Sequence, residues 1–329
     1  MEMAAKKVLL LPGDEPGPEM MDIAMSVMDL LVPGLEFLHA DIGRSAWEYT
    51  NEVLPADTED AIAESDVILC GPVDVSDLGK KDPVDTIILY NNLYMQATEF
   101  IRLNYISSRE LDTCIVTPVQ KVTRQINELE SLDGVESTYS TIAEDTERFF
   151  HRCISLAKTR GKSDLTHVSP SDIMPHSARF SESVFDECIS GSGIVPHTVT
   201  YSEAAEALAN KPIDAGMMAG GGIVGAGLRG IAYGLSNCRG LIGDAYIGDK
   251  LSLYTVGSNI PENRRNNPTA TLHAAACLLT DMGYIIEGKT LIAGIKEMYH
   301  ERKTTLDVTY GKLTAAEFGN CLIEWLNSN

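Results

Sequence analysis

The N-terminal part of the chain alternates short apolar runs with amphipathic segments, and this rhythm constrains the fold more than any other feature. The apolar runs Val8–Leu11, Leu35–Ala40 and Asp66–Gly71 are bounded by turn residues, which is typical of buried strands. Between them, Glu19–Val32 and Thr58–Ser65 carry apolar residues at helical spacing. Strands that alternate with helices in this way predict an α/β fold with a parallel sheet.

The middle of the chain also alternates expected strands with expected helices. Strands are expected at residues 112–117, 165–169, 195–201 and 214–218, and helices at 140–158, 177–188 and 203–209. Residues 131–138 are polar and include a glycine, so we interpret them as a protruding loop or a short arm. The sequence therefore predicts a second α/β layer.

Charge and composition exclude several kinds of partner. The chain of 329 residues has a net charge of −21 and 44% hydrophobic residues, enough apolar material for a sizeable core. Nucleic acid and anionic membranes both attract basic surfaces, so neither is an expected partner. The seven cysteines form no CxxC pair and are interpreted as reduced thiols. No apolar run reaches the roughly 18 residues of a membrane-spanning helix, and we expect a cytoplasmic protein.

Several motifs occur along the chain in a recognisable order. They are Gly13-Asp14 with Gly17-Pro18-Glu19, Leu69–Val73, Gly257-Ser258 with Asn267–Leu279, and Thr305–Gly319. The first joins a strand to a helix, and the last closes the chain. In order and spacing, these segments resemble the isocitrate and isopropylmalate dehydrogenase family along nearly the whole chain.

The resemblance implies an isopropylmalate-dehydrogenase-like two-domain α/β fold, with parallel and mixed sheets flanked by helices. Residues 1–98 plus 245–329 would form a large terminal domain. Residues 99–244 would form a central domain that carries the dimer interface and a candidate arm near 131–138. The resemblance also implies a homodimer whose active sites lie between the domains and take residues from both subunits.

The metal site that the resemblance implies is missing. Oxidative decarboxylation in this family uses a divalent cation, which prefers oxygen ligands, held by two aspartates four residues apart on one helix. Those positions correspond here to Val224 and Leu228. No carboxylate occurs between Met217 and Ala232, so we assign no metal-binding residue.

The acid and base of the family are missing as well. Pro170 stands where the resemblance places the catalytic lysine, and Arg124 lies near the position of the tyrosine. The resemblance also implies arginines that bind the substrate carboxylates. Arg102 is the candidate for one that is retained, and Thr117 occupies the position of another. An altered, metal-independent site would draw on five candidate catalytic residues, namely Arg102, Arg124, His167, Asp172 and Arg229.

The cofactor segment is altered but partly retained. Its candidate binding residues are Gly257, Ser258, Glu262, Arg264, Arg265 and Asn267. In this hypothesis Glu262 replaces the aspartate that meets the adenosine ribose, and the adjacent arginines meet phosphates. NAD(P) is therefore retained as a candidate cofactor, although dinucleotide binding is expected to be weakened.

A glycine-rich segment, Gly220–Gly230, occupies the place of the missing carboxylates. One interpretation is an anion site at a helix N-terminus, with Arg229 further along the helix. The other is packing, since Gly225, Gly227, Gly230 and Gly234, together with Ala226, leave smooth helix faces that suit close approach of a partner helix. We favour packing, because no Lys-Ser/Thr pair follows the glycines as in a P-loop.

Three functions stay open at this level. The chain is expected to be a binding or regulatory protein for a small anionic metabolite or nucleotide, or an enzyme with metal-independent chemistry. The alternative is an NAD(P)-dependent 2-hydroxy-acid oxidoreductase with a rearranged site. The missing carboxylates count most strongly against this last function.

Overall fold

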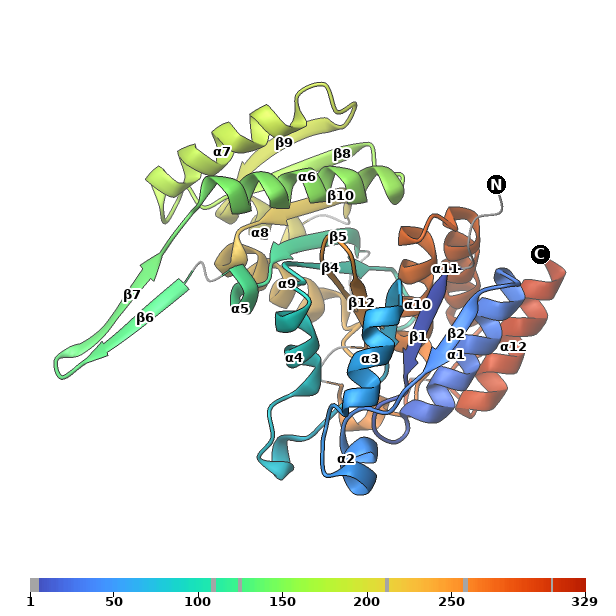
Figure 1. Cartoon of the computed structure of the whole chain (residues 1–329). Coiled ribbons are helices and arrows are strands. Elements are labelled where there is room, and N and C mark those ends of the chain that lie inside the picture. Colours follow the sequence, from blue (N-terminus) through green and yellow to red (C-terminus); the bar gives the residue numbers. More distant parts are fainter. Residues whose placement is uncertain (1–5, 108–110, 124–125, 211–212, 257–259, 309) are drawn as a thin grey trace, which may run out of the picture. The chain divides into compact units, whose positions relative to one another are not determined.

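The protein forms two compact units (Figure 1). The computed structural model describes residues 6–107, 111–123, 126–210, 213–256, 260–308 and 310–329. Unit 1 comprises Met1–Leu93, Ile101–Ser108 and Asn237–Asn329, and unit 2 comprises Tyr94–Phe100 and Arg109–Ser236. Both units contain β-strands with flanking helices, and the predicted α/β fold class is confirmed.

Unit 1 contains a mixed sheet with the strand order β2-β1-β3-β12-β11. Its strands are β1 (Lys7–Leu11), β2 (Glu36–His39), β3 (Val67–Cys70), β11 (Asp244–Ile247) and β12 (Ser252–Thr255). Its helices are α1 (Gly17–Leu31), α2 (Arg44–Thr50), α3 (Ala56–Glu64), α4 (Pro83–Tyr90), α10 (Thr269–Asp281), α11 (Ile285–His300) and α12 (Ala315–Ser328), with short 3₁₀ turns η1 (Ser76–Leu78) and η2 (Glu262–Arg264). The β1, β2, β3 and β12 pairings are parallel, and β11 pairs antiparallel with β12.

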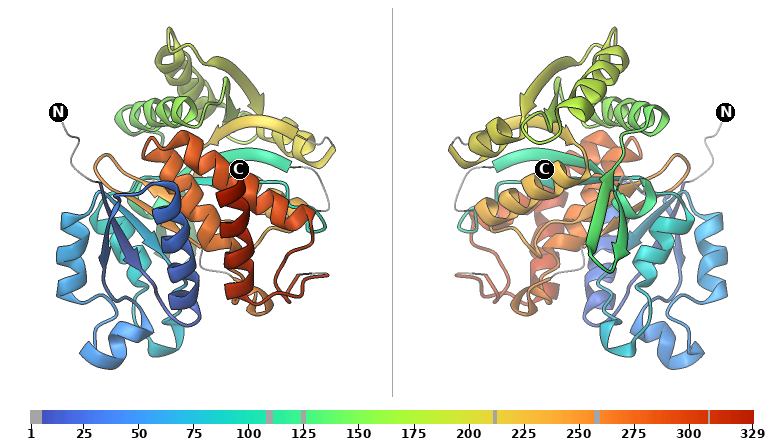
Figure 2. Two further views of the ribbon diagram at one scale, coloured as in Figure 1. Left: turned by 90° about the vertical axis from the view of Figure 1, so that its right-hand side faces the viewer. Right: turned by 90° about the vertical axis from the view of Figure 1, so that its left-hand side faces the viewer.

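The core of unit 1 follows from the apolar spacing of its elements. Val8–Leu11 of β1 is fully buried, as expected for an internal parallel strand. In α1, apolar residues recur every three or four positions and bury one face, which includes Met20, Ala24 and Val27. This helix packs beside α12 and α10 (Figure 2). Helix α10 is buried on nearly every side, including His273, whose Nδ1 accepts a hydrogen bond from the Gly243 amide at 3.1 Å.

Unit 2 has the strand order β4-β5-β10-β8-β9. Its strands are β4 (Met95–Phe100), β5 (Leu111–Pro118), β8 (Asp164–Ser169), β9 (Val195–Thr200) and β10 (Ile213–Gly220). Its helices are α5 (Gln120–Thr123), α6 (Ala143–Thr159), α7 (Pro175–Ile189), α8 (Tyr201–Asn210) and α9 (Gly222–Ser236). Strand β4 is antiparallel to β5, and the other pairings are parallel.

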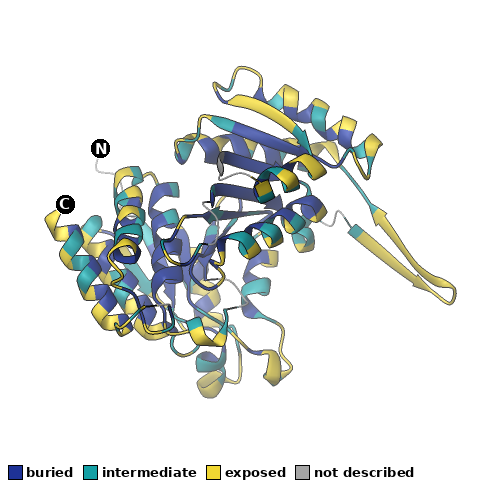
Figure 3. Ribbon diagram, turned by 180° about the vertical axis from the view of Figure 1, so that it is seen from behind, coloured by how far each residue is buried: buried dark blue, intermediate teal, exposed yellow. Residues whose placement is uncertain are grey.

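A β-hairpin extends from unit 2 and is exposed along almost its whole length (Figure 3). Its strands are β6 (Ile126–Ser131) and β7 (Gly134–Tyr139), joined by the two-residue loop Leu132-Asp133. Residues 131–138, expected as a loop or short arm, thus include the turn and most of β7. The Asp133-Gly134 pair at the loop favours the tight turn of a β-hairpin. The polarity of the segment by itself indicates only a loop.

Within the described ranges, no helix is long and apolar enough to cross a bilayer. All seven cysteines carry free thiols, and those at 70, 114, 153 and 238 are buried.

A largely buried ion-pair cluster links β4 to the end of α6 in unit 2, with side chains that are 5–19% exposed. The Glu99 carboxylate lies 2.8 Å from Arg160 Nη1 and 3.0 Å from Lys162 Nζ. Burial opposes ionisation of Glu99, but the two cations outweigh it and lower the pKa of Glu99 to about 2. Because the folded-state pKa is lower than the unfolded value, the cluster stabilises the protein above about pH 4.5 and loses this contribution as pH falls toward 2.

We predict that Glu99→Gln lowers the free energy of unfolding by about 3 kcal/mol at pH 7, because two cations are left without their carboxylate. Urea unfolding from pH 7 to pH 3 measures this effect, and the difference between variant and wild type should shrink as pH falls. Glu130→Gln on the exposed hairpin is the matched control. Equal stability of the two variants at pH 7 would contradict the assignment.

Candidate functional site

The turn between β1 and α1 is held by backbone contacts and by one carboxylate. A Cβ atom at Gly13, where φ is +75°, would lie 2.2 Å from the Pro72 carbonyl oxygen, so only glycine fits. The Asp14 carboxylate accepts hydrogen bonds from the amides of Arg44 at 2.6 Å and Asp74 at 2.7 Å. Gly13 and Asp14 of this motif therefore fix the positions of neighbouring loops in unit 1.

The segment after β10 contains no metal ligands. Val224 and Leu228 lie on α9 and are 2% and 0% exposed, so both side chains belong to the apolar interior of unit 2. Throughout the described residues, no group of three or more His, Cys, Asp or Glu side chains is placed to hold a metal ion. The side chains of Val224 and Leu228 therefore offer no oxygen ligand to the divalent cation that the family resemblance implies.

The glycines of α9 divide into a packed set and an open set. A Cβ at Gly225 would lie 2.0 Å from Thr117 Cγ2 of β5, and one at Gly227 would lie 2.4 Å from the Tyr201 hydroxyl. Cβ atoms at Gly230 and Gly234 would meet no atom within 4 Å. Gly225 and Gly227 thus form the packed set, which is explained by close approach inside unit 2. Gly230 and Gly234 form the open set and are exposed.

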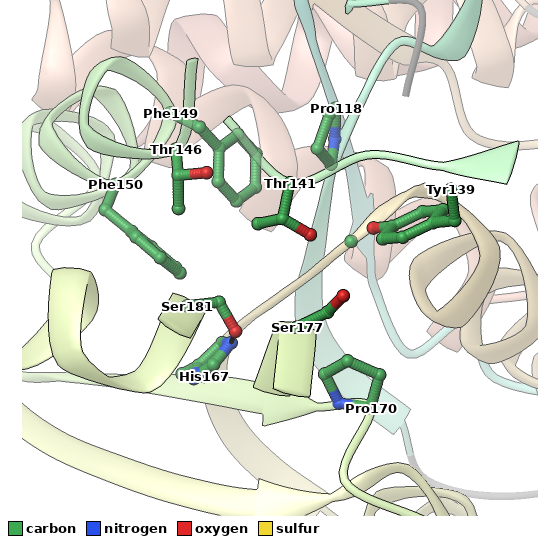
Figure 4. Close-up of a pocket in the computed structure, with 11 residues that line it drawn as sticks. Pro118, Tyr139, Thr141, Thr146, Phe149, Phe150, His167, Pro170, Ser177 and Ser181 are labelled. Carbon is green, nitrogen blue, oxygen red and sulfur yellow. Dashed lines mark hydrogen bonds between the residues drawn. The ribbon is translucent and has the colours of Figure 1, made fainter. Parts of the chain in front are cut away.

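A pocket surrounds the position of Pro170, where the resemblance places the family's lysine (Figure 4). His167 on β8 is 2% exposed and is packed between the rings of Phe150 and Phe185. Its Nε2 lies 3.4 Å from Ser181 Oγ, and its Nδ1 has no hydrogen-bond partner. Burial lowers the pKa of His167 to about 4, so the imidazole is neutral at pH 7.

The remaining candidate catalytic residues of unit 2 have separate partners. Asp172 is exposed and accepts a hydrogen bond from the Ser202 amide at 3.1 Å, in the first turn of α8. Hydrogen bonds from Ser202 lower the pKa of the Asp172 carboxyl. Arg229 Nη1 donates to Thr117 Oγ1 at 3.1 Å. His167, Asp172 and Arg229 therefore each contact a different residue, namely Ser181, Ser202 and Thr117.

The other two candidates are not part of this group. Arg102 is an exposed residue of unit 1. Arg124 lies outside the described residues.

The candidate cofactor residues of unit 1 hold the local fold. Arg264 Nη1 donates to the carbonyls of Asn237 and Arg239 at 2.7 Å each, and Arg265 Nη2 lies 3.9 Å from an Asp74 oxygen. Asn267 is buried; its Oδ1 accepts from the Thr269 amide at 3.0 Å at the start of α10. Glu262 is exposed in η2, and Gly257 and Ser258 lie outside the described residues.

A groove of about 530 Å³ lies beside this segment in unit 1. It is lined by Glu19, Asn263, Asn266, Thr305, Leu306, Asp307, Leu313, Thr314 and Ala315. The volume is in the usual range of small-molecule sites. Thr305 is 3% exposed, and its Oγ1 has no hydrogen-bond partner. The groove thus combines apolar walls with carboxylates, amides and an unused hydroxyl.

Sequence reasoning missed Tyr139, Thr141, Ser177 and Ser181, which line the unit 2 pocket. Single hydroxyl residues carry no local sequence signal. They come together only because α6 and α7 pack over β8.

Comparisons with known proteins agree with this architecture. The chain matches the sequence model of the family described as isocitrate/isopropylmalate dehydrogenase over residues 7–322. The 3-isopropylmalate dehydrogenase of Archaeoglobus fulgidus is 24% identical over 328 residues, which cover 96% of this chain and 98% of that protein. The chain belongs to the isocitrate/isopropylmalate dehydrogenase family.

Solved structures show the same fold at low sequence identity. An isocitrate dehydrogenase from Methylococcus capsulatus matches with a TM-score of 0.79 and 20% identity, covering 98% of this chain and 99% of that one. A beta-decarboxylating dehydrogenase from Thermococcus kodakarensis, solved in its apo form, matches with a TM-score of 0.83 and 18% identity, covering 98% and 96%.

Two substitutions on α9 should have opposite effects on stability. Gly225→Ala should lower the free energy of unfolding by about 1–3 kcal/mol, because the methyl group would overlap Thr117. Gly230→Ala should raise it by roughly 0.5–1 kcal/mol, because alanine favours the helix and the site is open. Chemical unfolding of both variants measures the difference. Effects of the same sign would contradict the division into packed and open glycines.

Proposed function

We propose that this family member does not carry out metal-dependent oxidative decarboxylation and instead binds a small anionic metabolite or a nucleotide. The binding serves either a regulatory role or metal-independent chemistry. The observation that carries the proposal is the burial of Val224 and Leu228, at the positions that correspond to the family's metal aspartates. A divalent cation requires oxygen ligands, and valine and leucine provide none.

The groove of unit 1 supports nucleoside binding better than phosphate binding. Glu19 and Asp307 contribute carboxylates, which accept hydrogen bonds from ribose hydroxyls but repel phosphates. Leu306 and Leu313 provide apolar surface for a base. Arg264 Nη1 already donates to two backbone carbonyls. This nitrogen is therefore not available to bind a phosphate. These features favour the adenosine end of a nucleotide in the groove.

The proposal includes a homodimer that functions in the cytoplasm. Exposed apolar residues of unit 2 support a second copy of the chain as partner. Leu129 and Val135, on opposite faces of the hairpin, are 68% and 61% exposed. On α9, exposed Ile223 and the open Gly230 and Gly234 form an uncharged outer face. Isolated two-stranded hairpins are only marginally stable in water, so a partner subunit would stabilise the arm.

An NAD(P)-dependent 2-hydroxy-acid oxidoreductase with a rearranged site is the second candidate. It is favoured by the relatives named 3-isopropylmalate dehydrogenase, which match over nearly the whole chain. The absence of metal ligands at Val224 and Leu228 makes it the weaker proposal.

The first test is turnover. With Mg²⁺ or Mn²⁺ and either NAD⁺ or NADP⁺, we expect less than about 1 s⁻¹, the low end of ordinary enzyme rates, for isocitrate, isopropylmalate, homoisocitrate, malate and tartrate. The absorbance of the reduced nicotinamide measures the rate. The 3-isopropylmalate dehydrogenase of Archaeoglobus fulgidus, assayed in parallel with isopropylmalate, is the positive control. Faster metal-dependent turnover of any of these substrates by this chain would overturn the proposal.

The second test concerns the groove. Adenosine and AMP should raise the midpoint of thermal unfolding, because a ligand at 100 times its Kd adds about 2.7 kcal/mol to stability. Thr305→Val should weaken this binding by about fivefold, since it removes one hydrogen-bonding group worth about 1 kcal/mol. Thr280→Val, which replaces a buried hydroxyl bonded to the Ala276 carbonyl, is the matched control. Unchanged affinity in Thr305→Val would place the ligand elsewhere.

A further inference from the structure

The pocket of unit 2 is a small polar chamber without charged walls. It measures about 40 Å³ and is lined by Pro118, Tyr139, Thr141, Thr146, Phe149, Phe150, His167, Pro170, Ser177, Ser181 and Gly221. None of these side chains carries a charge at neutral pH, since the one imidazole is neutral. The volume admits a group of a few heavy atoms and excludes a whole nucleotide.

Hydroxyl groups from different elements converge on this chamber. Figure 4 shows the hydroxyls of Tyr139, Thr141 and Ser177 pointing toward a common space. Thr141 Oγ1 is buried and has no hydrogen-bond partner. Burial raises the pKa of Tyr139, so its phenol keeps its proton at neutral pH. A buried hydroxyl without a partner costs stability, which a ligand that accepts its proton would recover.

Helix termini add to the donor character of the chamber. Ser177 belongs to the first turn of α7, and Gly221 directly precedes α9, whereas Thr146 of α6 already donates its amide and its hydroxyl to the Ile142 carbonyl. Neither α6 nor α7 has a side-chain N-cap. First-turn amides have no partner within their helix, and the partial positive charge there favours an anion. Glu144 and Asp145 also lie in the first turn of α6, and their charges disfavour a multiply charged ligand such as phosphate.

We propose that this chamber binds the carboxylate group of a small monocarboxylic acid. The hydroxyls of Tyr139, Thr141 and Ser177 donate hydrogen bonds to the carboxylate oxygens, and the rings of Phe149 and Phe150 contact the apolar part of the acid. The chamber lies entirely in unit 2, so this site is independent of the nucleoside groove in unit 1. It stands whether or not that groove binds a nucleotide.

The experiment uses the full-length chain with selectively ¹³C-labelled histidine, because the His167 imidazole lines the chamber and reports on its occupancy. Sodium acetate and sodium pyruvate are titrated against sodium chloride of equal ionic strength, and acetamide is the neutral control of matched shape. We expect the carboxylates to shift the His167 resonances saturably, with a millimolar Kd, and acetamide to bind at least about tenfold more weakly.

Variants test whether the chamber is the site. Thr141→Val keeps the shape and should weaken acetate binding about tenfold, as expected for a hydrogen bond to a charged group. Gly221→Ala should abolish binding, because a Cβ there would lie 2.7 Å from the Tyr139 hydroxyl. Ser183→Ala, on the exposed side of α7, is the control variant and should bind acetate like the wild type.

Two results would overturn the site. One is equal binding of acetamide and acetate, which would show that charge is not recognised. The other is a His167 signal that does not saturate up to about 100 mM acetate, a hundred times a millimolar Kd. Failure of adenosine to bind the groove would leave this result unaffected.

Discussion

Close approach of backbone to backbone at the end of β1 and β3 is the constraint on which unit 1 depends. Cβ atoms at Gly17 and Gly71 would lie 2.1 Å and 2.0 Å from the same Pro12 carbonyl oxygen. Each glycine therefore permits a contact that any side chain would prevent. Asp14 then anchors the loops that converge on this junction through backbone amides. Strand β1, whose residues Val8–Leu11 are buried beside it, is held in place by that junction as well as by its pairing.

In unit 2 a glycine also permits close approach, here between a helix and the sheet. Gly225 brings α9 against Thr117 of β5, so the helix that follows β10 lies too close to the sheet for a side chain at that point. Val224 and Leu228 on the same helix face the interior. An aspartate in either place would bury a charge in apolar surroundings at high cost. The apolar side chains at these two positions are thus part of the packing of α9, and the hydroxyl groups of the unit 2 pocket lie around β8, α6 and α7.

Much of the fold was predictable from local patterns, whereas most of the candidate site was not. Apolar runs and helical spacing predicted strands and helices such as β1 and α1 to within a few residues, because burial of one face leaves a periodic trace. The hairpin β6–β7 was expected only as a loop or arm, because its strands are exposed and so lack an apolar pattern. His167 was a candidate from the sequence because it lies near Pro170, where the resemblance places the family's lysine. Tyr139 and Thr141 did not, because their role depends on contacts between segments far apart in the sequence.

By itself the sequence determined the family and the α/β class, since these follow from residue type, order and spacing. Tertiary structure alone decided which polar groups are available. Asp14, Arg264 and Asn267 are consumed by bonds within the fold, whereas Thr141 and Thr305 keep buried hydroxyls without partners. The physical reason is that hydrogen-bond satisfaction depends on distances between residues remote in the chain, and no local pattern encodes those distances.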